Sequence, residues 1–127
     1  LQMKYEYGLR LITHKEYDKA IPYLQEAQKD PKLKINAMNK TGVCFFLKGW
    51  YADAADLFTQ AFELCKIKDS DIAKEVRYNL ARSLEEDKKL EKALEIYRKI
   101  AQLDFAFEDV GQRVNKLRKI IEKPASQ

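Results

Sequence analysis

The residues that could carry out catalysis are few and lie far apart in the sequence. The single histidine is His14, and the serines are Ser70, Ser83 and Ser126. Covalent catalysis needs a nucleophile held within hydrogen-bond reach of a base, and no such pair is apparent. The four glycines are isolated from one another, so there is no glycine-rich loop to bind phosphate. We therefore expect that the protein is not an enzyme and uses no cofactor.

Metal binding is equally poorly supported. Glu85, Glu86 and Asp87 are adjacent, and adjacent side chains diverge around a helix instead of sharing one ion. Cys44 and Cys65 have no second Cys or His at metal-ligand spacing. We expect both thiols to be buried as small apolar side chains, which favours a reducing compartment such as the cytoplasm.

Small and large residues recur at fixed spacings in three places. Offsets of 3, 9, 12, 16 and 19 residues from Gly42 reach Phe45, Tyr51, Ala54, Phe58 and Ala61. From Gly8 they reach Leu11, Tyr17, Ala20, Leu24 and Ala27, and from Ala81 they reach Leu84, Leu90, Ala93, Tyr97 and Ile100. Small residues let two helices approach closely, and the large ones fill the space beside them.

The distance between the copies indicates a helical hairpin repeat. Gly42 lies 34 residues after Gly8, and Ala81 lies 39 residues after Gly42, so five residues are inserted once. Over about residues 1–105 the sequence resembles the tetratricopeptide repeat family. The motif of that family has Gly or Ala, then Tyr or Phe three residues on, Ala at twelve, an aromatic residue at sixteen and Ala at nineteen. The sequence departs from the family at Lys4, Met38 and Arg77, which replace its Trp, and at Ile100, which replaces the last small residue.

The resemblance implies an all-α fold, a right-handed superhelical stack of antiparallel helix hairpins with seven helices. We expect a single domain over residues 1–127, with repeats at about 1–34, 35–72 and 73–106 and a capping helix at about 107–123. The first six helices are predicted at about 2–14, 17–29, 31–48, 51–66, 71–87 and 90–103. Asp30 with Pro31 is a predicted helix start, and so is Asp69-Ser70-Asp71 at the end of the insertion.

The two ends of the predicted stack differ. Spacings of three and four residues place the apolar residues of the capping helix on one stripe: Phe107, Val110, Val114, Leu117 and Ile121. Such a helix shields the last hairpin from water. The first helix is apolar on two sides, so it needs cover on both or faces a ligand. The chain begins inside this helix, and we expect it to be part of a larger protein. Pro124–Gln127 is expected to be a frayed end.

The net charge of +4 comes from the end of the chain. Residues 1–110 hold 19 Lys and Arg against 19 Asp and Glu, whereas residues 111–127 hold five basic residues against Glu122 alone. A basic last helix complements its own dipole, so we favour a solvated surface and consider nucleic-acid binding unlikely. No apolar run approaches the roughly 20 residues of a membrane span, so membrane insertion is not expected.

The resemblance also implies a function, because in that family the first helix of each hairpin lines a concave groove that binds a peptide or a partner helix. The groove positions carried onto this chain are Tyr5, Leu9, Ile12, Asn36, Asn39, Lys40, Val43, Phe46, Tyr78, Asn79 and Arg82, joined by Arg113 of the capping helix. We expect these positions to be exposed, and the asparagines to hydrogen-bond a peptide backbone. Lys40, Arg82 and Arg113 favour a ligand with an acidic or carboxylate-bearing segment beside an apolar one. Family members that clamp a chaperone's C-terminal carboxylate have Lys and Asn where this chain has Tyr5 and Leu9, so that ligand is not expected.

Three alternatives remain open. The apolar groove positions could be unrecognised core, and Trp50 could be either a binding anchor or a cover for the end of a hairpin. The chain as a whole could be a structural self-association unit, forming a homo-oligomer through its apolar first helix or its capping helix.

Overall fold

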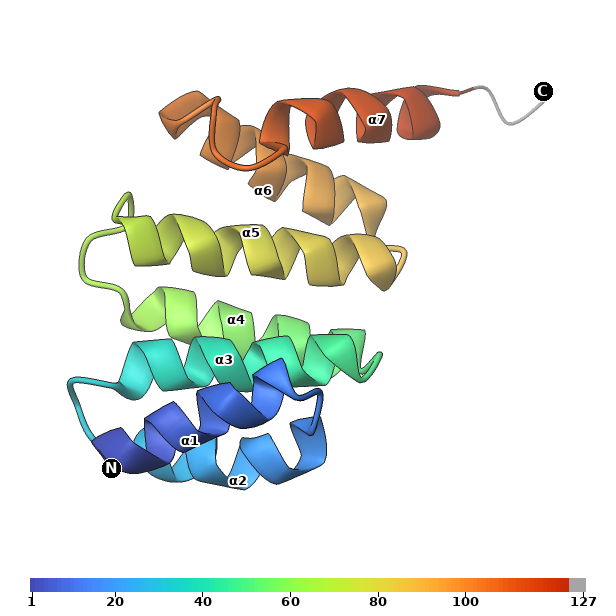
Figure 1. Ribbon diagram of the computed structural model, residues 1–127. Helices are drawn as coiled ribbons and strands as arrows, with labels where there is room; N and C mark the ends of the chain where they lie inside the picture. The colour runs from blue at the N-terminus through green and yellow to red at the C-terminus, as the bar shows by residue number, and fades with distance from the viewer. Residues whose placement is uncertain (124–127) are drawn as a thin grey trace.

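Residues 1–123, the part of the chain that the computed structural model describes, form seven α-helices and no strand (Figure 1). In chain order the helices are α1 (Gln2–Thr13), α2 (Tyr17–Ala27), α3 (Lys34–Leu47), α4 (Tyr51–Leu64), α5 (Asp71–Glu86), α6 (Leu90–Leu103) and α7 (Val110–Glu122). The predicted all-α fold is confirmed. The predicted frayed end at 124–127 lies outside the described residues.

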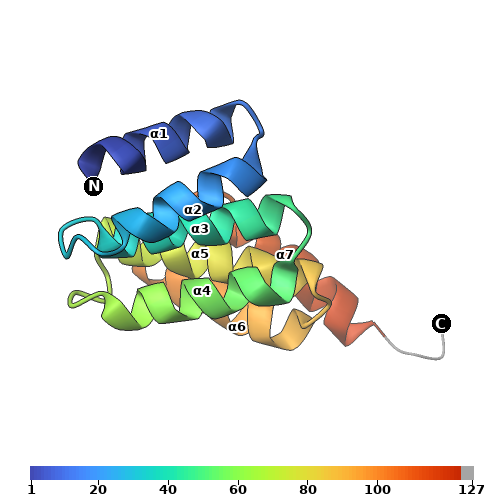
Figure 2. The same cartoon turned by 90° about the horizontal axis from the view of Figure 1, so that it is seen from below.

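The helices pack mainly against their neighbours in sequence. α1 with α2, α3 with α4 and α5 with α6 form three hairpins, and α7 packs against α6. The hairpins follow one another along the stack, and Figure 2 shows them displaced sideways from one to the next. The odd-numbered helices also contact each other, α1 with α3 and α3 with α5. These three helices therefore present a shared face.

Small residues on the first helix of each hairpin allow the second helix to approach closely. A Cβ added to Gly42 would lie 2.6 Å from the Phe58 ring, and one added to Gly8 would lie 2.8 Å from Leu24. In the third hairpin, Ala81 and Tyr97 are both fully buried in one cluster. The turns follow the same register, because Lys15, Gly49 and Lys88 all have positive φ. The offsets read from the sequence thus correspond to contacts that repeat in space.

The predicted helix starts have different outcomes. Ser70 is the N-cap of α5, and its hydroxyl accepts a hydrogen bond from the Ala73 N–H at 3.3 Å, as predicted. The prediction at Asp30-Pro31 is wrong, since α3 begins only at Lys34. The Asp30 carboxylate accepts from the Lys32 N–H at 3.0 Å and forms a local turn instead. This turn brings Leu33 into a buried cluster with Ala27 and Ala37.

The five-residue insertion forms the link between α4 and α5 and closes the end of α4. The Lys68 ammonium donates to the backbone oxygens of Phe62 at 2.7 Å and Glu63 at 3.1 Å. Carbonyls in the last turn of a helix lack helical partners, so a lysine here acts as a C-terminal cap. The Phe62 ring also receives two cations, Lys68 at 4.7 Å and Arg77 at 4.4 Å from its centroid.

The capping helix covers the last hairpin as predicted. Val110, Val114 and Leu117 are buried in the cluster that contains Tyr97 and Ile100, and Phe107 and Ile121 pack against it. Polar residues occupy most of the outer surface of α7. Within residues 1–123, no helix is long and apolar enough to cross a membrane.

The close approach at Gly42 predicts a contrast between two glycine substitutions. Gly42→Ala should destabilise the fold, because Phe58 is only 1% exposed and any shift of its ring disturbs its packing against Ala54, Ala61 and Val76 in the core. Overpacking of this kind costs about 1–3 kcal/mol, which outweighs the gain of about 1 kcal/mol that Ala brings to a helix. Urea denaturation followed by circular dichroism would measure the change.

Gly111→Ala is the matched control. Its added Cβ would also lie 2.6 Å from a ring, that of Phe105, but Phe105 is 72% exposed and can rotate into solvent. We expect no loss of stability. If both variants were destabilised equally, burial of the facing ring would not be the deciding factor.

Candidate protein-binding groove

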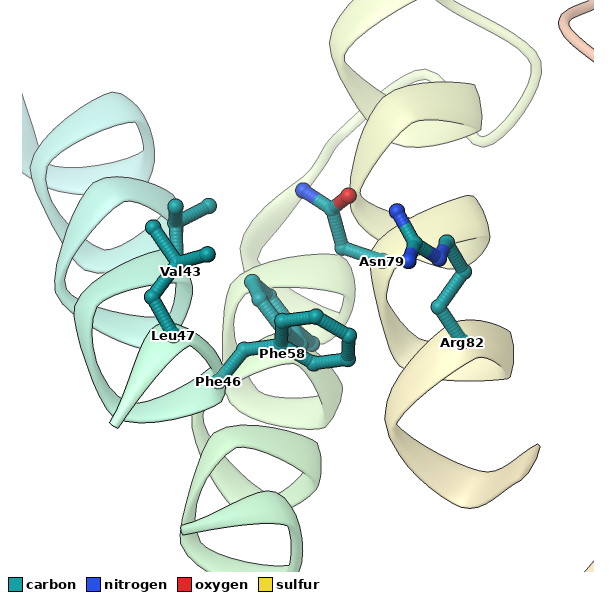
Figure 3. A pocket seen from close by; sticks show the side chains of 6 residues that line it. All are labelled: Val43, Phe46, Leu47, Phe58, Asn79 and Arg82. Carbon is teal, nitrogen blue, oxygen red and sulfur yellow. The ribbon is translucent and has the colours of Figure 1, made fainter. Parts of the chain in front are cut away.

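Most of the residues predicted to line the groove belong to α1, α3 and α5, and we call the face that these three helices share the groove face. A hollow of about 120 Å³ opens on this face between α3 and α5. Figure 3 shows the side chains around it, which come from α3, α4 and α5. The lining residues are Val43, Phe46, Leu47, Phe58, Asn79 and Arg82. Four of the six belong to the predicted set, Val43, Phe46, Asn79 and Arg82.

Asn39 does not have the exposed position that the sequence predicted, because its side chain is fully buried. Its amide nitrogen donates to a carboxylate oxygen of Glu75 at 2.6 Å, and its amide oxygen accepts from the Asn79 amide at 3.0 Å. A buried amide needs such partners. Asn39 therefore joins α3 to α5 beneath the groove face.

The carboxylate of Glu75 sets the direction of this hydrogen-bond chain. An ionised carboxylate only accepts, so Asn39 must turn its NH₂ toward Glu75 and its oxygen toward Asn79. Asn79 must then donate through its own NH₂. Its oxygen is left to accept, and Figure 3 shows that oxygen on the side of Asn79 nearer Arg82.

Arg82 is the basic group of the hollow. Its guanidinium lies over the ring of Phe46, 5.0 Å from the centroid. Among residues 1–123 no carboxylate lies within ion-pair distance of it. The cation–π contact holds the guanidinium beside the apolar wall while leaving its N–H donors available.

The predicted residues of α1 lie on the groove face but outside the hollow. Tyr5 and Ile12 are partly buried and pack against the core of the first hairpin. Burial raises the pKa of Tyr5, and the nearby charge of Glu75 raises it further. Leu9 is also partly buried, so the apolar side chains of α1 are neither full core nor fully exposed. On α3, Asn36 is exposed and Lys40 is partly buried.

Tyr78 and Arg113 are engaged in a polar cluster that joins α5 to α7. The Tyr78 hydroxyl donates to Asp109 at 2.5 Å, and Arg113 donates to Asp109 at 2.9 Å and to both oxygens of Glu85 at 3.2–3.3 Å. The Tyr97 hydroxyl and the Lys116 ammonium also contact Glu85. Arg113 was predicted to give the groove positive charge, but these carboxylates neutralise it.

The titration of this cluster follows from its contacts. Burial, followed by the hydrogen bond to Asp109, raises the pKa of Tyr78 to about 12. Burial and then the charge of Glu85 raise the pKa of Tyr97. Burial alone would raise the pKa of Asp109, but hydrogen bonds from Tyr78 and Arg113 lower it overall. A carboxyl with a lowered pKa stabilises the fold above its ordinary pKa and loses that effect as the pH falls, so the attachment of α7 should weaken in acid. The raised pKa values of Tyr78 and Tyr97 stabilise the fold below the ordinary tyrosine pKa, so the attachment should also weaken in strong alkali.

The sequence analysis missed two lining residues, Leu47 and Phe58. Leu47 is 48% exposed at the end of α3, and Phe58 reaches the hollow from the second helix of its hairpin. The sequence could have indicated Phe58, because the repeat pairs this residue with Gly42. The missing side chain of Gly42 lets the Phe58 ring reach the hollow on the groove face. Trp50, by contrast, stacks on Phe45 at 5.4 Å beneath the Lys48 ammonium, and so covers the end of its hairpin.

The two cysteines considered for chemistry lie in the core. Both cysteines are buried, as predicted, and burial raises the pKa of the Cys44 thiol to about 11. Within the described part of the chain, no group of three His, Cys, Asp or Glu side chains could hold a metal ion.

A family comparison agrees with the repeating hairpins. Residues 5–65 match the family model of the tetratricopeptide repeat. Residues 5–65 are thus similar to tetratricopeptide repeats. Repeats of this family are in general protein–protein interaction modules, and proteins that contain them bind protein partners. The match supports a general role in protein–protein interaction.

Comparisons with individual proteins add less. No curated protein matches the chain. Similar solved structures include a MamA RS-1 ArsTM double mutant, with 14% identity over 96% of this chain and 85% of that one and a TM-score of 0.49. Another is MamA 41-end from Desulfovibrio magneticus RS-1, with 18% identity over 94% of this chain and 84% of that one and a TM-score of 0.48.

The burial of Asn39 leads to a prediction about stability. Asn39→Ala removes both hydrogen bonds that link α3 to α5, one of them to a charged group, and should cost about 1–3 kcal/mol. Asn36→Ala, on the same helix but exposed, should change stability by less than about 0.5 kcal/mol. Thermal and urea unfolding of the two variants would provide the measurement. Equal stabilities would mean that the Glu75–Asn39–Asn79 chain contributes nothing to the fold.

Proposed function

We propose that the groove face binds a peptide or helix of a partner protein, with an apolar side chain in the hollow and an acidic group on Arg82. The observation that carries this proposal is the pairing of an apolar wall with an arginine that no carboxylate within the described residues neutralises. Most basic residues on protein surfaces stand in water, whereas Arg82 is partly buried against Phe46.

The energetics of such a contact are adequate for specific recognition. Burying one Val, Leu or Phe side chain contributes about 1.5–3 kcal/mol. A carboxylate that accepts two N–H groups of one guanidinium adds a charge-assisted contact with defined geometry. The oxygen of Asn79 supplies an acceptor for a ligand N–H. The hollow thus offers an apolar contact, a cation and a hydrogen-bond acceptor side by side.

The rest of the groove face extends the site. The 34-residue period places Leu9 and Ile12 of α1 at the same level as Val43 and Phe46 of α3. This row would accommodate further apolar residues of a ligand that crosses the helices, and Lys40 would add positive charge. The apolar part of the ligand would lie over α1 and α3, and its acidic part between α3 and α5. Two unpaired, buried thiols fit a module that works in the cytoplasm.

Selection from a random peptide display library would test this function. Wild-type protein should enrich peptides that carry an apolar residue close to Asp, Glu or a free C-terminus. Val43→Asp and Arg82→Glu should each abolish binding of the selected peptides, because they remove the apolar wall and reverse the charge.

Arg98→Glu is the matched control, since it reverses an exposed arginine on α6, away from the groove face. It should bind the peptides as wild type does. Peptides that bind all three variants equally well would place the binding site elsewhere. Failure to enrich any sequence would count against recognition of short segments.

A second candidate function, self-association through α1, is favoured by a separate observation. At the positions where α3 has buried Ala37 and Thr41 and α5 has Val76 and Leu80, α1 has Met3, 82% exposed, and Tyr7, 44% exposed. The equivalent residues of α3 and α5 are covered by the preceding hairpin. Sedimentation of Met3→Lys with Tyr7→Lys, compared with wild type, would show whether this surface joins copies of the chain.

A further inference from the structure

Two oppositely charged surfaces lie away from the groove face, on α4 and between α6 and α7. The α4 surface is acidic. Between Tyr51 and Leu64 the chain has no Lys or Arg, and the charged residues Asp53, Asp56 and Glu63 are all exposed. Spacings of three and seven residues put these carboxylates on one side of the helix. Among residues 1–123 none of the three has an ion-pair partner.

The second surface is a basic groove between α6 and α7. Arg98 of α6 and Arg118 of α7 line it, together with apolar or small residues such as Ala101, Gly111 and Val114, and no carboxylate lines this part. Within the described chain neither arginine forms an ion pair. Unlike Arg113 and Lys116 on the same helix, which bind Glu85, Arg118 has no acidic partner among residues 1–123.

An exposed aromatic ring marks one end of the basic groove. Phe105 is 72% exposed, and its ring lies on Gly111, where any Cβ would meet it at 2.6 Å. The glycine allows the tip of the ring to approach α7 beside the groove. An exposed apolar ring in this position is available to a partner.

We propose that a second copy of this chain docks α4 in this groove, with Asp53 and Asp56 toward Arg98 and Arg118. The two surfaces carry opposite charge, and within residues 1–123 these four residues form no ion pair, so the acidic surface of one copy pairs with the basic groove of the next. Exposed Leu64 at the end of α4 meets Phe105.

The spacing along the helices supports this register. Gly111, against which the Phe105 ring lies, is seven residues before Arg118, about 10 Å along α7, and Arg98 lines the same groove from α6. Leu64 lies eight residues after Asp56, about 12 Å along α4. With Leu64 on Phe105, Asp56 therefore reaches the level of Arg118, and Asp53 lies about one helical turn beyond it. On the far side of the arginines from Phe105, Glu91 and Glu95 line the surface between α6 and α7. These carboxylates would repel the acidic side of α4, so the contact is limited to the part of the groove near Arg98 and Arg118.

A charge-exchange experiment tests the proposal with the whole chain. In sedimentation velocity, wild type should associate at about 20 mM salt and dissociate at about 300 mM, because salt screens the attraction between the acidic surface and the basic groove. Arg98→Glu with Arg118→Glu should weaken association at least about tenfold, and so should Asp53→Lys with Asp56→Lys. An equimolar mixture of the two double variants should associate again, since each then offers the charge that the other needs.

Lys32→Glu with Lys34→Glu is the matched control for the arginine variant, because it makes the same change in net charge on exposed residues outside both surfaces. It should associate as wild type does. Circular dichroism of every variant checks that it is folded. A wild type that stays monomeric at low salt overturns the proposal, and so does a mixture that fails to recover while both variants are folded. Association that persists at high salt and is lost in the Met3→Lys, Tyr7→Lys variant would also overturn it, in favour of α1.

Discussion

The close approach of two helices at a small residue is the constraint on which the rest of the structure depends. At Gly8 and Gly42 the missing side chain leaves room for Leu24 and Phe58, and Ala81 stands in the same place beside Tyr97. Each hairpin therefore has a similar separation and register. Because the hairpins match, equivalent residues of α1, α3 and α5 point to the same side of the stack, and a row of side chains across three helices becomes a surface. The groove face follows from this repetition.

The repetition explains why so much of the fold could be predicted from the sequence. The offsets from each small residue reflect helix packing within one hairpin, which is local, and the stripe of Val110, Val114 and Leu117 reflects the cover over the last one. The start of α3 could not be predicted in the same way. Asp30 and Pro31 satisfy the rules for a helix start, but burial of Leu33 against Ala27 and Ala37 favours a turn there. Local capping preferences amount to about 1 kcal/mol, and a buried leucine outweighs them.

The candidate site was predictable in position but less so in character. The period placed Val43, Phe46, Asn79 and Arg82 on one face, and they do line one hollow. Whether a polar residue on that face meets water depends on residues distant in sequence. Asn39 is buried because Glu75, 36 residues away, accepts its hydrogen bond, and Arg113 is neutralised by Glu85, 28 residues away. No periodicity contains that information.

The hydrogen-bond chain through Asn39 also divides the groove face mechanically. Between α3 and α5, Asn39 links Glu75 and Asn79 across the helices, so the two walls of the hollow are held at a fixed separation. Within residues 1–123 no side-chain hydrogen bond or ion pair joins α1 to α3, and their contact is apolar packing, which tolerates small displacements better than a directional bond does. A ligand group bound between α3 and α5 would enter a preformed site and lose little free energy to reorganisation. A ligand group over α1 would meet a wall that can move. We therefore expect the Arg82 hollow to dictate which ligands bind, and the α1 side to accommodate variation among them.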